Sequence, residues 1–476
     1  MNRFKLAFSR SLVAALSLSF SAATLANYRD FAALLPAGSQ MGFVLMQPDG
    51  TVTASHNGDQ LLLPASTLKL VTATAAWLQL GESFRFTTTI ETGEITDGVA
   101  NGDLVIRMSG DPTLKRPDLF RLVRELKNQG LHTINGNIRF DDSLFRGYNR
   151  APGWPWDDLG ICFSAPISQV MLDGNCAHIR LTLAGNKVVL NKPSHLPLDI
   201  RSEVTLGAMG PLCPLEMDID GKQYQLRGCT DRPLSLALAL DAPKGYVTEV
   251  LKQQLAEVGI TVKQQSKVRK LPTHEVARHQ SAPLPELLNH VLAKSDNQIS
   301  DSLLRTLGQQ RAGIGSFEGG IMAVKAIVKE QLGLELSAAD IYDGSGLSRY
   351  NLISPMMLAQ LLQRWQQPQL APLMAMLPIA GKSGTLRYRA SLRGLEGQVT
   401  AKTGTFKQVS NLAGFVGEGD NQQIVVQFVT GINATNGNAK QQVHEFEQAL
   451  FQCVLNDCFE LDESHATTAG EVVLAQ

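Results

Sequence analysis

The sequence predicts a mixed α/β fold in which both ends of the chain contribute strands to one antiparallel sheet. Strand patterns occur at 41–55 and again at 399–430, and helical patterns dominate from 284 to 366. Between 85 and 270, strand-like runs alternate with short helices, which is typical of an α/β region of its own. We therefore expect a sheet flanked by helices, interrupted by a large inserted α/β region that forms one or two extra domains.

Length and charge agree with this organisation and exclude one class of partner. The 476 residues are too many for a single typical domain. The 43 basic and 44 acidic side chains give a net charge of −1, whereas nucleic-acid-binding domains are usually clearly basic. We expect no nucleic acid partner.

Residues 1–26 have the pattern of an export signal. Basic residues precede the apolar stretch Ser11–Phe20, and small residues then lead to a cleavage site after Ala26. The alternative is a membrane anchor, but that would need about 20 apolar residues. We therefore expect an exported protein without a stable membrane anchor.

The cysteines are expected to form structural disulfides, because export leads to an oxidising compartment. Their spacing favours pairs between sequence neighbours, although other connectivities stay open. No C-x-x-C sequence occurs, and we expect neither a metal nor a cofactor. The residues concerned are Cys162, Cys176, Cys213, Cys229, Cys453 and Cys458.

The N-terminal part should form a hairpin followed by a buried helix. Met41–Met46 and Thr51–Ser55 flank Gln47-Pro48-Asp49-Gly50, which is a strong turn sequence. Ser66–Leu80 carries apolar residues on nearly every face, as a buried helix does. We expect a main domain made of 27–84 and 271–476, interrupted by 85–270.

The remaining elements follow from the same patterns. In the inserted region we expect strands at Phe86–Thr92, Asp103–Met108, Ile134–Phe140 and His178–Leu183, and helices at Leu119–Gln129 and Val247–Val258. Later helices are expected at Leu284–Ala293, Gln298–Gln310, Gly319–Leu332, Pro355–Gln366 and Lys440–Val454. The closing strands are expected at Val399–Lys402, Leu412–Val416 and Ile424–Thr430, joined by short turns that contain glycine.

Ser66-Thr67-Leu68-Lys69 is a candidate for nucleophilic catalysis. Residues three apart share a helix face, so the Lys69 amine can reach the Ser66 hydroxyl. A serine needs a base to become a nucleophile, and a lysine can be that base when burial lowers its pKa. Pro64 places Ser66 in the first helical turn, where backbone N–H groups can stabilise an oxyanion. The alternative is an ordinary capping serine beside a lysine without a catalytic role.

Two further motifs follow in the chain. Ser295-Asp296-Asn297 stands between two predicted helices, where these residue types are also favoured as ordinary N-caps. Lys402-Thr403-Gly404-Thr405 continues a predicted strand, so its backbone and hydroxyls can lie beside an extended peptide. Lys382-Ser383-Gly384-Thr385 repeats this pattern in a loop-like context and is expected to be a turn. Ser55-His56-Asn57 also matches S-x-N but lies in the early hairpin.

In the order S-x-x-K, S-x-N and K-[ST]-G, the motifs resemble the signature of the penicillin-binding protein and serine β-lactamase superfamily. Other stretches are similar to low-molecular-mass class C penicillin-binding proteins of the penicillin-binding protein 4 type, peptidase family S13. These stretches are Asp343–Ser348, Leu377–Gly381, Asn411–Phe415 and Cys162–Pro166. The resemblance implies a β-lactamase/transpeptidase-like domain with a large insertion between Lys69 and Ser295. It also implies a periplasmic D-alanyl-D-alanine carboxypeptidase and endopeptidase.

The resemblance further implies an acyl-enzyme mechanism. Ser66 would attack the carbonyl of the penultimate D-Ala of a peptidoglycan stem peptide, and Lys69 would accept its proton. Ser295 and Asn297 would relay a proton to the leaving group and hold the peptide backbone. Water would then release the acyl group, and β-lactam antibiotics would acylate the same serine as inhibitors.

The strand motif would bind the substrate's C-terminal end. Lys402 and Thr403 would hold the terminal carboxylate, with Gly404 next in the strand. The N–H groups of Ser66 and Thr405 would form the oxyanion hole. Two lysines near one serine should also lower each other's pKa by like-charge repulsion.

Asp157 and Asp158 belong to an acidic loop of the inserted region. If the insertion leans over the cleft, Asp158 can pair with the free amine of a diaminopimelate side chain. The alternative is an acidic loop that only faces solvent.

Two other functions stay open. A β-lactamase on the same fold would hydrolyse antibiotics rapidly, whereas an inactive wall-binding scaffold would not need all the motifs. Glu286-Leu287-Leu288-Asn289 is one residue short of the E-x-x-L-N motif of class A β-lactamases and precedes Ser295, so we expect an ordinary helix there. The expected partners are peptidoglycan stem peptides and cross-links. The oligomeric state stays open, and a dimer is allowed.

Overall fold

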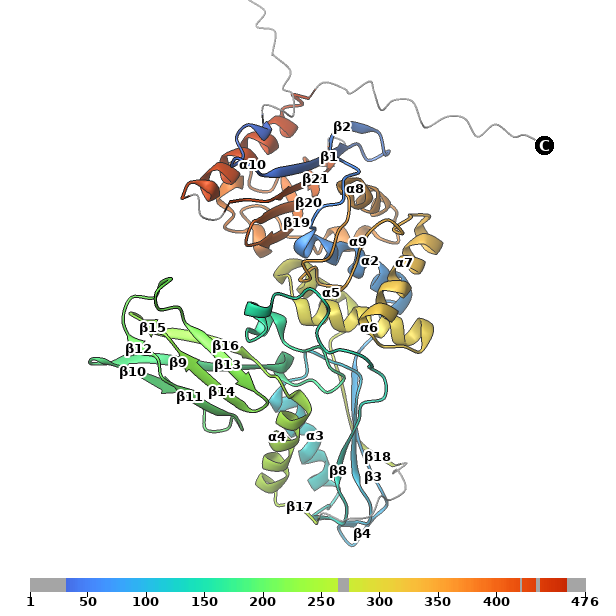
Figure 1. The fold of residues 1–476 in the computed structure, drawn as a ribbon. Coiled ribbons are helices and arrows are strands. Elements are labelled where there is room, and N and C mark those ends of the chain that lie inside the picture. Colours follow the sequence, from blue (N-terminus) through green and yellow to red (C-terminus); the bar gives the residue numbers. More distant parts are fainter. Residues whose placement is uncertain (1–30, 264–273, 420–421, 434–436, 460–476) are drawn as a thin grey trace, which may run out of the picture.

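A computed structural model describes residues 31–263, 274–419, 422–433 and 437–459. The expected export signal, residues 1–26, lies outside these residues. Figure 1 shows an elongated molecule with a helix-covered sheet at one end and the inserted region extending away from it. No helix in the described part of the chain is long and apolar enough to cross a membrane.

The two ends of the chain combine in one antiparallel sheet, as predicted, with the strand order β19-β20-β21-β1-β2. Because side chains alternate along a strand, Val44 of β1 packs on the helical side while Phe43 and Leu45 pack on the opposite side. The strands are β1 (Gln40–Met46), β2 (Val52–His56), β19 (Val399–Phe406), β20 (Val409–Val416) and β21 (Gln423–Thr430).

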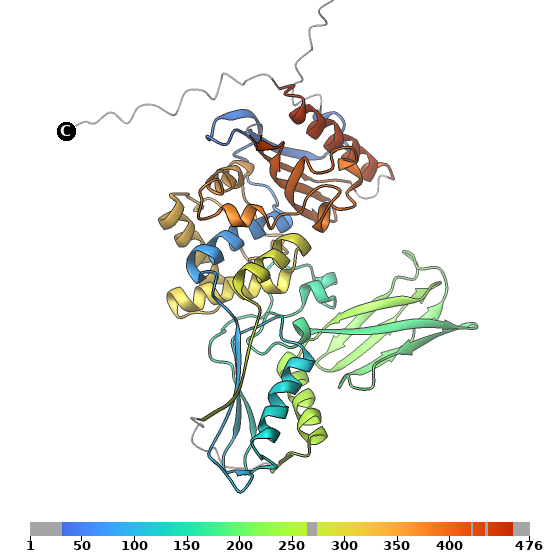
Figure 2. The same ribbon diagram turned by 180° about the vertical axis from the view of Figure 1, so that it is seen from behind.

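Helices cover both faces of this sheet (Figures 1 and 2). One face packs against α10 (Ala439–Leu455). The other face packs against a helical layer made of α2 (Lys69–Leu80), α5 (Leu284–Lys294), α6 (Asn297–Ala312), α7 (Phe317–Leu332), α8 (Pro355–Arg364) and α9 (Ala371–Met374). A turn of 3₁₀ helix, η1 (Ala65–Leu68), leads into α2, whose residues from Lys69 to Ala76 are buried as the sequence predicts.

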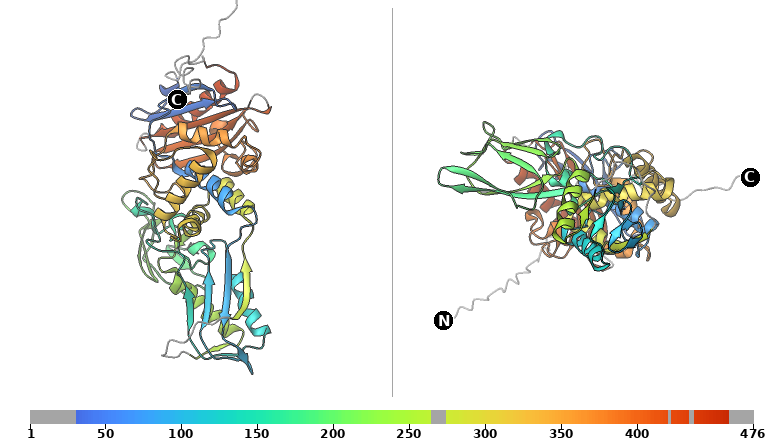
Figure 3. Two further views of the ribbon diagram at one scale, coloured as in Figure 1. Left: turned by 90° about the vertical axis from the view of Figure 1, so that its right-hand side faces the viewer. Right: turned by 90° about the horizontal axis from the view of Figure 1, so that it is seen from below.

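The inserted region leaves the helical layer on one strand and returns on its neighbour. Strand β3 (Thr87–Thr92) pairs antiparallel with β18 (His274–Gln280), and the sheet continues through β6 (Leu104–Met108) and β8 (Ile138–Asp141). Figure 3 shows these strands leading away from the helices. Because β18 pairs with β3, we propose that the insertion ends near Gln280 rather than at 270.

Two helices and a small sheet complete this lobe. They are α3 (Arg116–Asn128), α4 (Pro243–Glu257), β4 (Ile95–Thr96), β5 (Val99–Ala100), β7 (Thr133–Ile134) and β17 (Thr261–Val262). The single strand predicted at Ile134–Phe140 is wrong, because β7 and β8 belong to different sheets. The break lies at Gly136, where a Cβ atom would stand 2.1 Å from the Gly102 carbonyl oxygen. Only glycine permits this close approach.

The rest of the insertion is a lobe of short strands, drawn in green in Figure 1. Its strands are β9 (Cys176–Ala184), β10 (Lys187–Asn191), β11 (Asp199–Ser202), β12 (Thr205–Leu206), β13 (Glu216–Asp220), β14 (Gln223–Arg227), β15 (Cys229–Thr230) and β16 (Leu234–Ala239). One hydrophobic core runs through both lobes of the insertion. The cysteines form disulfides between sequence neighbours, as their spacing favoured: Cys162–Cys176, Cys213–Cys229 and Cys453–Cys458.

Arg305 of α6 attaches the inserted region to the helical layer. Its buried guanidinium donates to the Gly315 carbonyl at 2.9 Å, to the Arg146 carbonyl at 2.7 Å and to the Ile167 carbonyl. It also lies 4.6 Å from the centre of the Phe145 ring. Because the Arg146 and Ile167 carbonyls belong to the insertion, these two bonds hold the insertion to α6.

Candidate active site

The side chain of Lys69, at the start of α2, is fully buried and contacts three oxygens from separate parts of the chain. Its Nζ atom lies 2.9 Å from Ser66 Oγ, 2.7 Å from Asn297 Oδ1 and 2.5 Å from the Ser345 carbonyl oxygen. The structure therefore brings Ser66, Lys69 and Asn297 together, as the motif order suggests.

This geometry suits a proton acceptor. An ammonium has three donors, whereas a neutral amine has two donors and one lone pair. When Lys69 is neutral, Asn297 and Ser345 can accept its two N–H groups, and the lone pair then faces the Ser66 hydroxyl. The site can thus take the proton from Ser66 without rearrangement.

The surroundings of Lys69 increase the fraction of its amine that is uncharged near neutral pH. Burial lowers the pKa of Lys69 to about 8, although the charges of Asp301, Asp343 and Asp296 raise it in part. The pKa of Lys402 is lowered well below its usual range by burial and by the Lys69 charge. Burial is therefore the main cause for both lysines, and the like-charge repulsion expected from the sequence adds to it at Lys402.

The backbone around Ser66 adopts an unusual conformation. Ala65, which precedes it, has φ +47°, a left-handed value that costs free energy for a residue with a Cβ atom. Gly346, with φ +79°, packs so closely that an added Cβ would stand 1.9 Å from the Ala65 carbonyl oxygen. Contact with Gly346 therefore helps to hold Ala65, and with it Ser66, in position.

The Ser295-Asp296-Asn297 motif divides its work between structure and site. Asp296 is the N-cap of α6 and accepts the Ile299 N–H at 2.9 Å, so the N-cap interpretation holds for this residue. Ser295 ends α5 with φ +64°, and its hydroxyl lies 2.9 Å from Lys402 Nζ. Asn297 contacts Lys69. The left-handed turn at Ser295 lets neighbouring side chains reach different lysines.

Strand β19, which carries the K-T-G motif, is the edge strand of the sheet. The segment around Pro378 covers its first half, where the Ala401 N–H donates to the Pro378 carbonyl at 3.0 Å. The motif continues beyond this cover. Lys402 is fully buried and contacts Ser295 Oγ and the Thr403 carbonyl, each at 2.9 Å. Lys402 thus contacts Ser295 of the S-x-N motif, which the sequence did not predict.

Gly404 of the motif packs against the protein interior, whereas Thr405 is exposed to solvent. A Cβ atom added to Gly404 would lie 2.6 Å from the Pro64 carbonyl oxygen, so Gly404 lets β19 pack directly against η1. Thr405 is exposed. The motif therefore sets the distance between the edge strand and the turn that carries Ser66.

The second K-[ST]-G copy is a turn, as expected, but its last residue reaches the site. The Thr403 hydroxyl lies 2.9 Å from the hydroxyl of Thr385, which is the middle residue of η5 (Gly384–Leu386). Sequence reasoning missed this contact, and it also missed the Ser345 carbonyl next to Lys69. The repeated K-S-G-T pattern was the one available signal for Thr385.

The inserted region forms part of the site. In η3 (Cys162–Ser164), the Phe163 carbonyl accepts a hydrogen bond from Asn297 Nδ2 at 2.8 Å. The neighbouring Cys162 carbonyl accepts one from the Gln298 side chain. The insertion thus orients the amide whose oxygen faces Lys69.

Asp158 lies in η2 (Trp156–Asp158), on the same part of the insertion. Its side chain is half-buried, and burial together with Asp157 raises its pKa, while Arg349 and Lys407 lower it. Lys407 follows β19 directly. The charges of Arg349 and Lys407 therefore act on Asp158, and Lys407 lies just beyond the end of β19.

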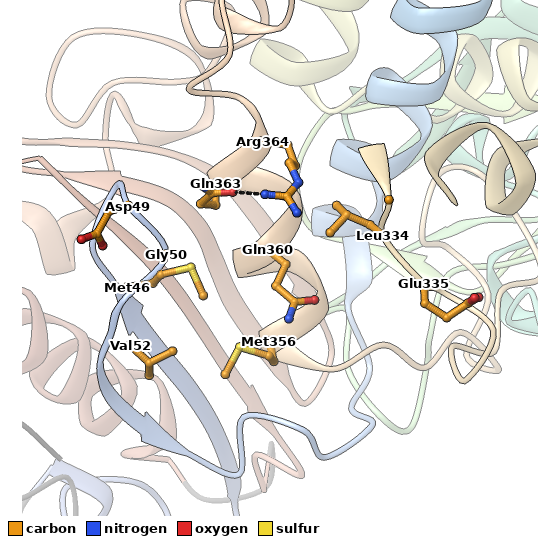
Figure 4. A pocket seen from close by; sticks show the side chains of 11 residues that line it. Met46, Asp49, Gly50, Val52, Leu334, Glu335, Met356, Gln360, Gln363 and Arg364 are labelled. Atoms are coloured by element: carbon orange, nitrogen blue, oxygen red, sulfur yellow. Dashed lines mark hydrogen bonds between the residues drawn. The ribbon is translucent and has the colours of Figure 1, made fainter. Parts of the chain in front are cut away.

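A separate pocket lies between the β1–β2 turn and α8 (Figure 4). Its volume is about 460 Å³, and Met46, Asp49 and Met356 are among the residues that line it. None of the predicted site residues belongs to it. In the described ranges, no cluster of three or more His, Cys, Asp or Glu side chains could hold a metal ion.

Comparisons with known proteins found a matching family and similar structures. The family model "D-Ala-D-Ala carboxypeptidase 3 (S13) family" matches residues 25–450. The chain is 36% identical over 459 residues to D-alanyl-D-alanine carboxypeptidase DacB of Haemophilus influenzae, covering 92% of this chain and 96% of that protein. The crystal structure of penicillin binding protein 4 (dacB) from Haemophilus influenzae matches with a TM-score of 0.83 and 34% identity, covering 91% of this chain and 100% of that one. Its complex with a β-lactam matches with a TM-score of 0.79 and 32% identity, with the same coverage.

The Gly346 contact yields a testable prediction. Gly346→Ala should slow the labelling of Ser66, the predicted nucleophile, by more than about 100-fold, because the new Cβ would displace the turn that carries this serine. The measurement is the second-order rate constant for labelling by a fluorescent penicillin.

Gly333→Ala is the matched control. Gly333 has a similar φ of +67°, but an added Cβ would meet nothing within 4 Å. This variant should lose only about 1 kcal/mol of stability and label at the normal rate. Equal labelling of both variants would contradict the role given to Gly346.

Proposed function

Because the chain belongs to the D-Ala-D-Ala carboxypeptidase 3 (S13) family, we propose that its serine-type D-Ala-D-Ala carboxypeptidase activity proceeds through an acyl-enzyme on Ser66. The contact of Lys69 with both Ser66 and Asn297 is the observation that carries this proposal. We further propose that the enzyme acts in the periplasm on peptidoglycan stem peptides. It would also cut D-Ala-diaminopimelate cross-links as an endopeptidase.

Acylation begins with neutral Lys69. The Ser66 oxygen attacks the carbonyl carbon of the penultimate D-Ala while its proton moves to Lys69 Nζ, 2.9 Å away. Negative charge then develops on the carbonyl oxygen. Backbone N–H groups of Ser66, in the first turn of η1, and of Thr405, on the edge strand, would stabilise it.

The leaving amine of the terminal D-Ala needs a proton. Ser295 is suited to deliver it, because its hydroxyl is held by Lys402 at 2.9 Å. The tetrahedral intermediate collapses as the C–N bond breaks, which leaves the peptide as an ester of Ser66. Water attacks this ester in the second half of the cycle, and the Ser66 oxygen regains a proton.

The edge strand provides the binding surface for an extended peptide. Strand addition to β19 would place the substrate backbone between the edge strand and α6. Lys402, together with the Thr403 and Thr405 hydroxyls, would bind a carboxylate at the end of this strand, and that carboxylate would in turn favour the protonated amine. A free C-terminus would thus distinguish carboxypeptidase substrates.

Asp158 is proposed to contribute to side-chain specificity. The charges of Asp158 and Arg349 act on each other's pKa, so one carboxylate and one guanidinium belong to this part of the structure. This pair complements the ammonium and carboxylate of a diaminopimelate side chain. The hydrogen bond from Asn297 to the Phe163 carbonyl of η3 supports this proposal, because η3 follows η2 directly in the chain.

β-Lactam antibiotics are proposed to acylate Ser66 and to leave slowly. The relative with a bound β-lactam supports binding at this site. A fast β-lactamase needs a base for deacylation, and the sequence that came nearest to such a motif, Glu286–Asn289, lies within α5 as an ordinary helix. The proposed function is therefore a penicillin-sensitive peptidase rather than a β-lactamase.

A labelling experiment tests the proposed function. The wild-type enzyme should form a lasting adduct with fluorescent penicillin and release D-Ala from a peptide ending in D-Ala-D-Ala. Ser66→Ala should do neither, because the nucleophile is missing. Absence of label on the wild type would refute the proposal, and rapid loss of the label with antibiotic turnover would favour the β-lactamase.

The specificity proposal is tested with Asp158→Asn. Cleavage of peptides with an unmodified diaminopimelate should fall about tenfold in kcat/KM, because a charged hydrogen bond is lost. Peptides whose side-chain amine is acetylated should be cleaved as before.

Asp157→Asn serves as the matched control, since Asp157 is the exposed neighbour in the same loop. Its substrate preference should stay that of the wild type. An unchanged preference in Asp158→Asn would remove Asp158 from the site.

A further inference from the structure

The mechanism above leaves one buried carboxyl group near Lys69 without a role. Asp301 lies on α6 one turn after Asn297, and its side chain is fully buried. Its Oδ1 atom accepts the Gly344 N–H at 2.7 Å. Its Oδ2 atom has no hydrogen-bond partner in the part of the chain that the structure describes. Buried carboxyl groups are rare unless they serve a partner, so its surroundings matter.

The backbone connects Asp301 to Lys69. Gly344 is held through both of its backbone polar groups. Its N–H donates to Asp301, and its carbonyl accepts the hydroxyls of Thr72 at 2.8 Å and Ser300 at 2.7 Å. The next carbonyl, that of Ser345, lies 2.5 Å from Lys69 Nζ. The Asp301 carboxyl group therefore helps to fix one of the acceptors that orient the amine.

Asp301 also acts on Lys69 through its charge. Among the carboxylates that raise the pKa of Lys69, Asp301 has the largest effect, ahead of Asp343 and Asp296. In return, the Lys69 charge lowers the pKa of Asp301, which burial and the Asp343 charge raise well above its usual range. Both groups are buried, and the charge of each affects the pKa of the other.

Asp343 differs from Asp301 in its hydrogen bonds. Both of its oxygens are fully used, by the indole N–H of Trp154, the backbone N–H groups of Ser348 and Gly346, and the Asn351 amide. Asp343 thus anchors its loop. Asp301 accepts one backbone N–H, that of Gly344, and interacts with the Ser345 side chain, so it has fewer partners than Asp343 and can respond to a charge appearing on Lys69.

We propose that Asp301 is a positioning residue for acylation, because its ionised form, which the Lys69 cation favours, supplies the counter-charge for the ammonium that forms as Ser66 loses its proton. In this step the Ser66 O–H bond breaks, an N–H bond forms on Lys69, and the Ser66 oxygen bonds to the substrate carbonyl. Without Asp301 the new cation would have less compensation in a fully buried site. The inference rests on the proposed function, since it requires acylation of Ser66.

Other charged groups face this pair and would stay in place when Asp301 is changed. They are Asp296 at the N-cap of α6, His290 of α5 paired with Asp296 at 3.4 Å, Asp343, Lys402 of β19 and Arg305 of α6. Removing one negative charge from this set makes Lys69 a weaker base that loses its proton at lower pH. Replacing Asp301 by a neutral residue should therefore lower the pKa of Lys69.

Asp301→Asn tests the inference, because the amide oxygen can still accept the Gly344 N–H while the charge is lost. The readout is the rate of acylation by fluorescent penicillin between pH 5.5 and 10. In the wild type this rate should rise with pH to a midpoint near 8. In Asp301→Asn the midpoint should fall by about one pH unit or more, and the plateau rate should fall as well.

Controls separate charge from structure. Asp301→Glu retains the charge, so the midpoint of its pH profile should stay near that of the wild type. Asp340→Asn changes an exposed carboxylate upstream of the same loop, and both its midpoint and its plateau rate should equal those of the wild type. If Asp301→Asn does not fold, Asp301→Ser retains an acceptor without the charge. A variant that folds but keeps the wild-type midpoint would overturn the inference, even if its rate falls at every pH. A wild type that takes no label would instead refute the proposed function.

Discussion

The complete burial of Lys69 is the constraint on which the rest of the active site depends. A charged amine in the interior must have its donors satisfied or lose its charge. Its acceptors come from η1, from α6 and from the loop that contains Ser345. These segments are far apart in the sequence. The base therefore exists only when the sheet, the helical layer and the loop are assembled together.

The same requirement explains why the second lysine and the insertion belong to the site. Lys402 is also buried, and it is satisfied by Ser295 and by its own strand, so the edge strand and the end of α5 are held together. The insertion orients Asn297 from the opposite side through the Phe163 carbonyl. The inserted region is thus connected to the proposed catalytic groups by the hydrogen bond to Asn297 and through the buried guanidinium of Arg305.

The positions of helices and strands and the sheet built from both ends of the chain were predictable from the sequence, whereas the contacts made by loops were not. The contact of Ser66 with Lys69 follows from their spacing on a helix, and the two-ended sheet follows from strand patterns near each terminus. The direction of Lys402, the approach of Thr385 and the carbonyl next to Lys69 depend on loop paths, which have no periodic signal. The break at Gly136 was missed because tertiary packing decides it.

The central claim is that burial makes Lys69 a base near neutral pH. The most direct measurement is an NMR titration of the enzyme with isotopically labelled lysine, in which Lys69→Arg identifies the signal. We predict a midpoint near pH 8 for Lys69, with the neutral amine increasing above it. A midpoint near the ordinary lysine value of 10.5 would contradict the account, because too little neutral amine would then be present to take the proton from Ser66.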